Sequence, residues 1–281
     1  MTEKRLTCTF GFIGGGNIAK AICQGMVHKG LIEYSQVYAS AAHRNTLEEW
    51  ESLGAHVTTV NGVIVNEADI IFLSVKPHIL PEAIAQMLQT YNPSKAAHKL
   101  FISVITAITL ESLENILVDV EGARVIRVMP NTPLLVGEGC SVYCPGQHAT
   151  ENDIRLVKKI FKMSGICEMV PESLMVAAGA LIGSGPAFIY IIIEALSDGG
   201  VKLGIPRQTA TTFAAQTVLG AAKMVLDTNR HTGVLKEEVT SPGGTTISGI
   251  HALERGGIRA ALMDALEACV KRSDEIAIKK Y

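Results

Sequence analysis

A short polar turn late in the chain carries the residues best suited to hold a small acidic substrate. It reads Ser241-Pro242-Gly243-Gly244-Thr245-Thr246 and stands directly before a helix-like segment. Two glycines beside hydroxyl side chains can form a nest of backbone N–H groups at a helix start, and such a nest binds carboxylates. The hydroxyls can also donate a hydrogen bond to a substrate nitrogen. The simpler alternative is that a Ser or Thr here only caps the helix, which is common.

A second group of residues lies at a glycine-rich turn near the start of the chain. The stretch Ile13-Gly14-Gly15-Gly16-Asn17-Ile18-Ala19 follows an apolar, strand-like run and opens a helix-like segment. Gly14 permits a tight turn, Gly16 lets the backbone approach a pyrophosphate, and the small Ala19 lets the helix lie close to the strand. The helix N-terminus adds free N–H groups and a partial positive charge. This context favours a dinucleotide-binding turn over a purely structural one.

Two further strand ends indicate how the dinucleotide is bound. An acidic residue after the second strand would bind the ribose 2′-hydroxyl, but the stretch from Val37 to Arg44 contains none. Ser40 can donate a hydrogen bond there, and Arg44 or His43 can pair with a 2′-phosphate, so the sequence favours NADPH, with NADH as the alternative. Ser74-Val75-Lys76-Pro77 ends another strand, where the backbone can pass close to the cofactor. An ordinary exposed basic residue is the alternative for Arg44 and for Lys76.

These motifs need a scaffold, and the first part of the chain alternates between short apolar runs and helix-like segments. Strands are expected at Leu6–Ile13, Val37–Ala39, His56–Val60, Ile70–Val75, Leu100–Val104, Arg124–Val128, Gly137–Tyr143 and Cys167–Val170. Helices are expected at Asn17–Lys29, Asn45–Leu53, Ile79–Leu88, Thr109–Leu117 and Thr150–Met163. This alternation predicts an α/β, Rossmann-like domain over residues 1–170, with a parallel sheet covered on both faces.

The second part, residues 171–281, predicts an all-α domain. Helices are expected at Pro186–Leu203, Pro206–Leu226, Thr245–Arg255 and Ile258–Lys279. The segment Ala187–Val201 is apolar nearly all round, as in a helix that is buried on every side. A domain of this size has little interior, so we expect these helices to pack against a second copy of the chain.

One stretch of the second part approaches the length of a membrane-spanning helix. Residues 173–193 contain no charged side chain. Gly183-Ser184-Gly185-Pro186 divides the stretch into halves that are each too short to span. We therefore expect two buried helices that meet at a turn, and no membrane.

Composition excludes other classes of function. The formal net charge is -2, which leaves no strongly basic surface for nucleic acid. The six cysteines contain no C-x-x-C pair, so no metal site is expected. Scattered cysteines and a start without an apolar signal segment favour a reducing compartment, here the cytoplasm.

Several motifs together resemble the pyrroline-5-carboxylate reductase family over essentially the whole length. They are Gly11-Phe12-Ile13-Gly14, Ser74-Val75-Lys76-Pro77, Met129-Pro130-Asn131-Thr132-Pro133, Gly183-Ser184-Gly185-Pro186-Ala187, Asp198-Gly199-Gly200-Val201 and the 241–246 turn. The resemblance implies reduction of 1-pyrroline-5-carboxylate to L-proline by NAD(P)H, the last step of proline biosynthesis. It also implies a Rossmann-like domain and a helical domain that interlocks with its mate in a homodimer. Such dimers assemble further, often into decamers.

The resemblance also assigns roles to individual residues. Ser241, Gly244 and Thr245, with Gly243 in the same turn, would hold the substrate carboxylate, and Thr246 would hydrogen-bond the ring nitrogen. Glu172 would lie near the product, while Ser40 and Asn61 would contact the adenosine end of the cofactor. The cofactor would also contact Ile13–Ile18, Ser74–Pro77, Val104, Ile105 and Thr106. Ala107 replaces a glycine that the family usually has beside the nicotinamide, which puts the contacts of residues 104–107 in question.

The reaction places a hydride on the imine carbon and leaves a proton on nitrogen. A protonated imine loses its charge as the hydride arrives, so positioning can supply much of the rate. We expect Thr246 to orient the C=N bond and to relay a proton from water. One alternative is a β-hydroxyacid dehydrogenase or another imine reductase, for which Lys202 or Lys223 would be the candidate acid. Another is an NADP-binding sensor, which would have no need of a substrate-binding turn.

Overall fold

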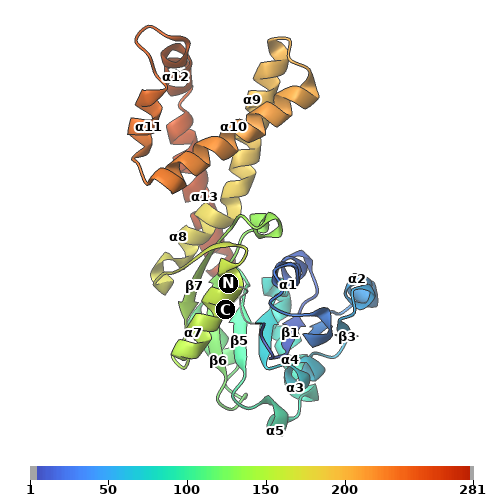
Figure 1. The fold of residues 1–281 in the computed structure, drawn as a ribbon. Coiled ribbons are helices and arrows are strands. Elements are labelled where there is room, and N and C mark those ends of the chain that lie inside the picture. Colours follow the sequence, from blue (N-terminus) through green and yellow to red (C-terminus); the bar gives the residue numbers. More distant parts are fainter. Residues whose placement is uncertain (1–4, 279–281) are drawn as a thin grey trace. The chain divides into compact units, whose positions relative to one another are not determined.

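The computed structural model describes residues 5–278 (Figure 1). The chain divides into two compact units, which we call unit 1 and unit 2. Of the described residues, unit 1 comprises 5–183 together with 270–278, and unit 2 comprises 184–269.

Unit 1 is built on one sheet of eight strands. The strands are β1 (Phe10–Ile13), β2 (Val37–Ser40), β3 (His56–Thr58), β4 (Ile70–Leu73), β5 (Leu100–Ser103), β6 (Arg124–Met129), β7 (Gly139–Pro145) and β8 (Gly165–Met169). They are ordered β3-β2-β1-β4-β5-β6-β7-β8. The prediction of a parallel sheet is confirmed for every neighbouring pair except β6 and β7, which are antiparallel. The connection between these two strands is too short for a crossover helix, so the chain turns back on itself.

Helices cover both faces of this sheet (Figure 1). The α-helices are α1 (Asn17–His28), α2 (Glu48–Ser52), α3 (Asn61–Glu67), α4 (Leu80–Thr90), α5 (Pro93–Ala96), α6 (Leu110–Ile116), α7 (Glu151–Lys162) and α8 (Met175–Gly179). Short 3₁₀ segments are η1 (Tyr34–Gln36), η2 (Arg44–Leu47), η3 (Pro77–Ile79), η4 (Thr132–Val136) and η5 (Glu172–Leu174).

Two apolar layers hold these helices to the sheet. One layer joins α1 and α7 to the side of the sheet that carries Phe72, and the other joins α3, α4 and α6 to the side that carries Ile71 and Leu73. Successive residues of β4 therefore enter opposite layers, and all of them are apolar because both faces are covered. The covering of both faces by helices explains the continuous apolar runs in the sequence.

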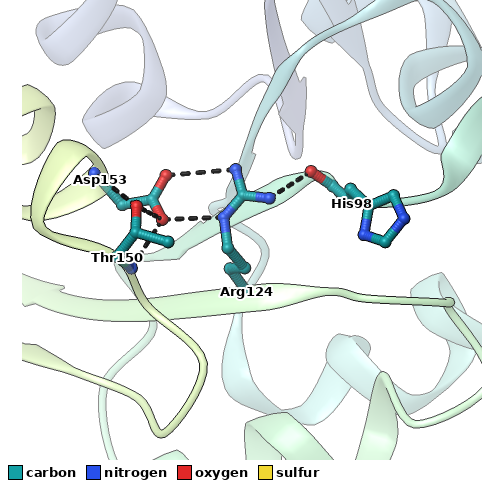
Figure 2. A network of polar contacts seen from close by, with 4 residues as sticks. All are labelled: His98, Arg124, Thr150 and Asp153. Carbon is teal, nitrogen blue, oxygen red and sulfur yellow. Dashed lines mark hydrogen bonds and ion pairs between the residues drawn. The ribbon is translucent and has the colours of Figure 1, made fainter.

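A polar network fixes the start of β6 to the start of α7 (Figure 2). Arg124 donates to both carboxylate oxygens of Asp153, at 2.8 and 3.2 Å, and to the carbonyl oxygen of His98. Thr150 caps α7, and its side chain and that of Asp153 form a capping box. Thr150 is therefore the N-cap of the helix that the sequence predicts over Thr150–Met163.

Unit 2 is helical, as predicted. Its helices are α9 (Gly185–Lys202), α10 (Arg207–Thr228), α11 (Thr232–Glu238) and α12 (Thr245–Arg255), and α13 (Ile258–Ile278) begins in unit 2 and ends in unit 1. Helices α9 and α10 form a hairpin (Figure 1). They approach closely, because a Cβ atom at Gly200 would lie 3.2 Å from the Cβ of Ala210. Most large apolar side chains on these two helices are exposed in the single chain, among them Tyr190, Ile191, Phe213 and Leu226.

The predicted break at Gly183–Pro186 is wrong. The π-helical segment η6 (Ala180–Ser184) joins α8 to α9 without a turn, and Pro186 lies in the first turn of α9. A proline there breaks no α-helical hydrogen bond, and a π-turn absorbs the change of register. The resulting helical run, Glu172–Lys202, is by length and composition able to cross a membrane. The expected burial of this segment is also not found in the single chain, since only 6% of its most apolar window is buried.

Candidate functional site

The glycine turn after β1 is held between the ends of β2 and β4. Gly14 has a φ of 105°, which L side chains rarely adopt, and a Cβ atom there would lie 2.7 Å from the carbonyl carbon of Ser74. Gly14 donates its N–H to the carbonyl oxygen of Ser40 at 3.0 Å. Its own carbonyl oxygen accepts from Ser74 Oγ at 2.7 Å. Gly14 therefore makes the tight turn that the sequence predicts, and only glycine fits.

The two following glycines have different surroundings. Trp50 donates its indole N–H to the carbonyl oxygen of Gly15 at 3.0 Å, which anchors the turn to α2. Gly16 is the N-cap of α1 and has no side chain to occupy the first N–H groups of the helix. A Cβ atom at Gly16 would meet nothing within 4 Å. The helix start is thus open to a ligand, and the cradle fits the phosphates of a dinucleotide.

Ser40 and Asn61, which lie far apart in the sequence, are hydrogen-bonded to each other. Ser40 is fully buried at the end of β2 and donates to Asn61 Oδ1 at 2.7 Å. Asn61 opens α3 and is itself fixed, because its Nδ2 donates to the carbonyl oxygen of Ala83 at 3.0 Å and its N–H donates to Gln86 Oε1 at 2.8 Å. The structure therefore brings together the two residues expected at the adenosine end.

The basic residue expected near a 2′-phosphate is exposed and already has an ion partner. Arg44 Nη2 lies 2.7 Å from Glu51 Oε1, and both side chains are more than half exposed. An exposed pair of this kind contributes little to stability and can exchange partners readily. Arg44 can therefore leave Glu51 for a phosphate.

The ends of β4 and β5 carry the remaining cofactor candidates. Val75 is half-buried, Lys76 is exposed, and Pro77 opens the short segment η3. Val104 and Ile105 are buried after β5, whereas Thr106 is exposed. The Val104 N–H donates to the carbonyl oxygen of Leu73 at 3.0 Å, which ties the two strand ends together. These residues share the carboxyl edge of the sheet with the glycine turn, where open α/β sheets bind ligands.

Glu172 has two hydrogen-bond donors within unit 1. Its Oε1 accepts from the Leu110 N–H at 2.5 Å and from Arg127 Nη1 at 3.3 Å. Arg127 is 2% exposed, and burial lowers the pKa of its guanidinium, against the opposing effect of Glu172. Sequence reasoning missed Arg127, although a basic residue inside an apolar strand signals a buried charge that needs a partner.

The polar turn of unit 2 leads directly into α12. The Gly244 N–H donates to the carbonyl oxygen of Ser241 at 3.1 Å, and Gly243 has a φ of 66°. Pro242 followed by a glycine of positive φ is the pattern of a type II turn. The N-cap of α12 is Gly244, and no side chain caps this helix. Capping by a Ser or Thr, the simpler explanation of the motif, is therefore wrong.

The hydroxyl of Thr246 is available to a ligand. It makes no hydrogen bond to any other residue in the described range 5–278, and the residue is half-buried. The first N–H groups of α12 are likewise not occupied by a side chain. A small acid that also carries a ring nitrogen matches this set of donors.

In the described part of the chain, no cluster of three or more His, Cys, Asp or Glu side chains could hold a metal. The cysteines are all free thiols, and burial raises the pKa of Cys23 and of Cys167 to about 12. Thiols with so high a pKa are poor nucleophiles and poor metal ligands.

The fold and the open glycine turn define a class, the dinucleotide-binding α/β proteins, here with a separate helical unit. Two family models match the chain accordingly. NADP oxidoreductase, coenzyme F420-dependent, matches residues 9–107, and pyrroline-5-carboxylate reductase dimerisation matches residues 172–276.

Relatives over the full length give the family. The pyrroline-5-carboxylate reductase of Methanosarcina acetivorans is 45% identical over 270 residues and covers 96% of this chain and 98% of its own. That of Glycine max is 43% identical over 271 residues and covers 96% of each chain. The solved pyrroline carboxylate reductase of Plasmodium falciparum with NADP bound has a TM-score of 0.85 at 29% identity and covers 98% of this chain and 100% of its own. The chain belongs to the pyrroline-5-carboxylate reductase family. The predicted family and fold class are confirmed.

Proposed function

We propose that the protein reduces 1-pyrroline-5-carboxylate to L-proline with NADPH, with NADH as the alternative donor. The observation that carries this proposal is the match to pyrroline-5-carboxylate reductases over 96% of the chain. The glycine turn supports it independently, because its open helix start accepts a dinucleotide pyrophosphate.

The cofactor would be held by loops of unit 1. Its contacts would be Ile13, Gly14, Gly15, Gly16, Asn17, Ile18, Ser40, Arg44, Asn61, Ser74, Val75, Lys76, Pro77, Val104, Ile105 and Thr106. The absence of an acid after β2, together with the exposed guanidinium of Arg44, supports NADPH. When bound, the cofactor supplies the hydride.

The substrate would be held by the turn before α12. The N–H groups of Gly243 and Thr245 and the hydroxyl of Ser241 would bind its carboxylate, next to Gly244, whose own N–H donates to the Ser241 carbonyl oxygen. Glu172 would lie near the product. Thr246 would hydrogen-bond the ring nitrogen, because its hydroxyl is unpartnered among the described residues. It would orient the C=N bond and relay a proton from water, so that the nitrogen ends as an amine when the carbon gains its hydride.

We further propose that residues 1–170 bind the dinucleotide, and that residues 171–281 bind the substrate and form the dimer. The exposed apolar side chains of α9 and α10 support packing against a second copy, with dimers assembling further, to decamers. On this account the apolar run Glu172–Lys202 faces another copy and not a membrane, and the protein is cytoplasmic. Light scattering of the protein in detergent-free buffer tests this account, since a monomer or an aggregate would contradict it.

The activity is tested by the loss of NADPH absorbance with 1-pyrroline-5-carboxylate as substrate. The proposal expects turnover with this imine and a higher kcat/KM with NADPH than with NADH. Turnover of hydroxyacids with NADP and not of the imine would instead indicate a hydroxyacid dehydrogenase.

A further inference from the structure

A buried charge lies in the apolar layer beneath the carboxyl edge of the sheet. Arg127 is the only charged residue of β6 between apolar neighbours, and it is 2% exposed. Its Nε is a buried polar atom that lacks a hydrogen-bond partner among the described residues. Burying a guanidinium this deeply is costly and needs a compensating function or partner.

Glu172 is that partner, and it also holds a second element. The same oxygen, Oε1, accepts from Arg127 Nη1 and from the backbone N–H of Leu110. Leu110 is the first residue of α6, directly after the connection from β5. The ion pair therefore fixes the far end of residues 104–109, while the bond from the Val104 N–H to the Leu73 carbonyl oxygen fixes the near end.

The connection held in this way contains a strained residue. Ala107 has a φ of 57°, in the left-handed region, and it is buried. A residue with a Cβ atom stays in this region only where the surroundings hold it there. The two fixed ends supply that constraint.

We propose that Arg127 and Glu172 are positioning residues, whose buried ion pair holds the 104–109 connection in the shape that receives the cofactor. The inference rests on the proposed function, in which Val104, Ile105 and Thr106 contact NADPH. It gives Glu172 a role through the backbone of Leu110 and not only near the product.

The same strand offers a matched control at its other end. Arg124 pairs with Asp153 and joins β6 to α7 (Figure 2). It lies beside Leu100 at the amino end of β5, whereas the 104–109 connection follows the carboxyl end of that strand. Glu172→Gln and Asp153→Asn each remove one charge from an arginine pair and keep the size of the side chain. NADPH affinity is measured for the full-length protein by fluorescence titration without substrate, beside the melting temperature.

Both variants are expected to lower the melting temperature, by about 4–8 °C for each pair lost. Only Glu172→Gln is expected to weaken NADPH binding, by about tenfold, as for a lost charge-assisted hydrogen bond. An unchanged NADPH affinity in Glu172→Gln, or an equal loss in Asp153→Asn, would overturn the inference.

A second variant separates the effect of backbone strain at Ala107 on NADPH affinity from a general loss of stability. Ala107→Gly removes the penalty of positive φ, so in the Glu172→Gln background it is expected to recover part of the lost affinity. Failure to recover any affinity would contradict the role assigned to the strained turn. If the wild type binds NADPH but does not reduce the imine, the proposed function fails, and the binding comparison still decides the role of the pair.

Discussion

Ser40 Oγ donates a hydrogen bond to Asn61 Oδ1 over 2.7 Å and so joins the end of β2 to the start of α3. Asn61→Ala would leave the buried Ser40 hydroxyl with only a long contact to the Phe12 carbonyl oxygen, at 3.4 Å. We expect NADPH to bind about five- to tenfold more weakly, since an unsatisfied buried group costs about 1–3 kcal/mol. Calorimetric titration with NADPH measures the effect.

Asn66 supplies the control for this change. It lies on the same helix, and its Oδ1 accepts from the Asn92 N–H at 2.8 Å on an exposed surface. Asn66→Ala should leave the NADPH affinity unchanged. Equal affinities for both variants and the wild type would show that the Ser40–Asn61 bond has no part in the cofactor site.

Two glycines of the first turn should respond differently to alanine. Gly16→Ala meets no protein atom within 4 Å and has an ordinary φ of -75°, so the protein should fold with an unchanged melting temperature. Its added methyl group would occupy the approach of the pyrophosphate, and NADPH binding should fall by about 100-fold or more, the loss expected for a displaced set of charge-assisted hydrogen bonds.

Gly14→Ala should instead disturb the fold. Its Cβ atom would lie 2.7 Å from the backbone of Ser74 and Val75, at a φ of 105°. We expect a loss of at least about 2 kcal/mol in the free energy of unfolding, measured by urea denaturation. A Gly16→Ala protein that binds NADPH normally would be inconsistent with the assigned pyrophosphate site.

The pairing of Asp153 with Arg124 predicts how stability depends on pH. Burial raises the pKa of Asp153, but hydrogen bonds from Arg124 and Thr150 outweigh it and hold the pKa below the ordinary value of 3.8. A depressed folded-state pKa stabilises the protein above the unfolded-state pKa, and this stability is lost as the pH falls through the folded value. The wild type should therefore lose stability on acidification below about pH 4.

Asp153→Asn should remove this component of the acid sensitivity. The variant should be less stable than the wild type at neutral pH by about 2 kcal/mol, as expected when a buried charged hydrogen bond is broken. The difference should shrink as the pH falls, which urea denaturation at a series of pH values measures. A constant difference across the series would argue against an ionised Asp153 in the folded state.

Thr246 should affect turnover and not cofactor affinity. Thr246→Ala removes the hydroxyl proposed to orient the imine, and kcat should fall by about 100-fold, within the range for assisted proton transfer. Thr246→Ser keeps the hydroxyl and should recover most of the rate. Steady-state kinetics with a parallel NADPH titration separates the two effects, and an unchanged kcat in the alanine variant would remove Thr246 from the mechanism.

The strands of unit 1 could be predicted because buried parallel strands are continuous apolar runs between turns. The helix α3 could not, since Val63, Ile64 and Val65 favour a strand by propensity. Tertiary packing decides there, because Gly62 lets α3 approach α4 so closely that a Cβ atom would lie 2.3 Å from the carbonyl carbon of Thr90. The propensities of neighbouring residues give no information about that contact.

Helix α11 and the partner of Arg127 were also missed, the first because of an unusual local cap and the second because of a distant contact. Helix α11 is capped by His231, whose Nδ1 accepts from the Gly233 N–H at 3.1 Å, and histidine is not a usual cap in sequence patterns. The ion pair of Arg127 and Glu172 joins residues 45 positions apart. The motifs at Gly14–Ala19 and Ser241–Thr246 were predictable because each is a local backbone shape that its own glycines require.

The most direct test of the proposed reaction follows the hydride itself. The protein is incubated with 1-pyrroline-5-carboxylate and with NADPH that carries deuterium on either face of the nicotinamide ring, and the product is analysed by mass spectrometry and NMR. If the protein reduces the imine directly, one of the two labelled forms should yield L-proline with deuterium on the ring carbon that forms the C=N bond in the substrate. Proline without deuterium from both forms, or no proline at all, would contradict direct reduction of the imine by this protein.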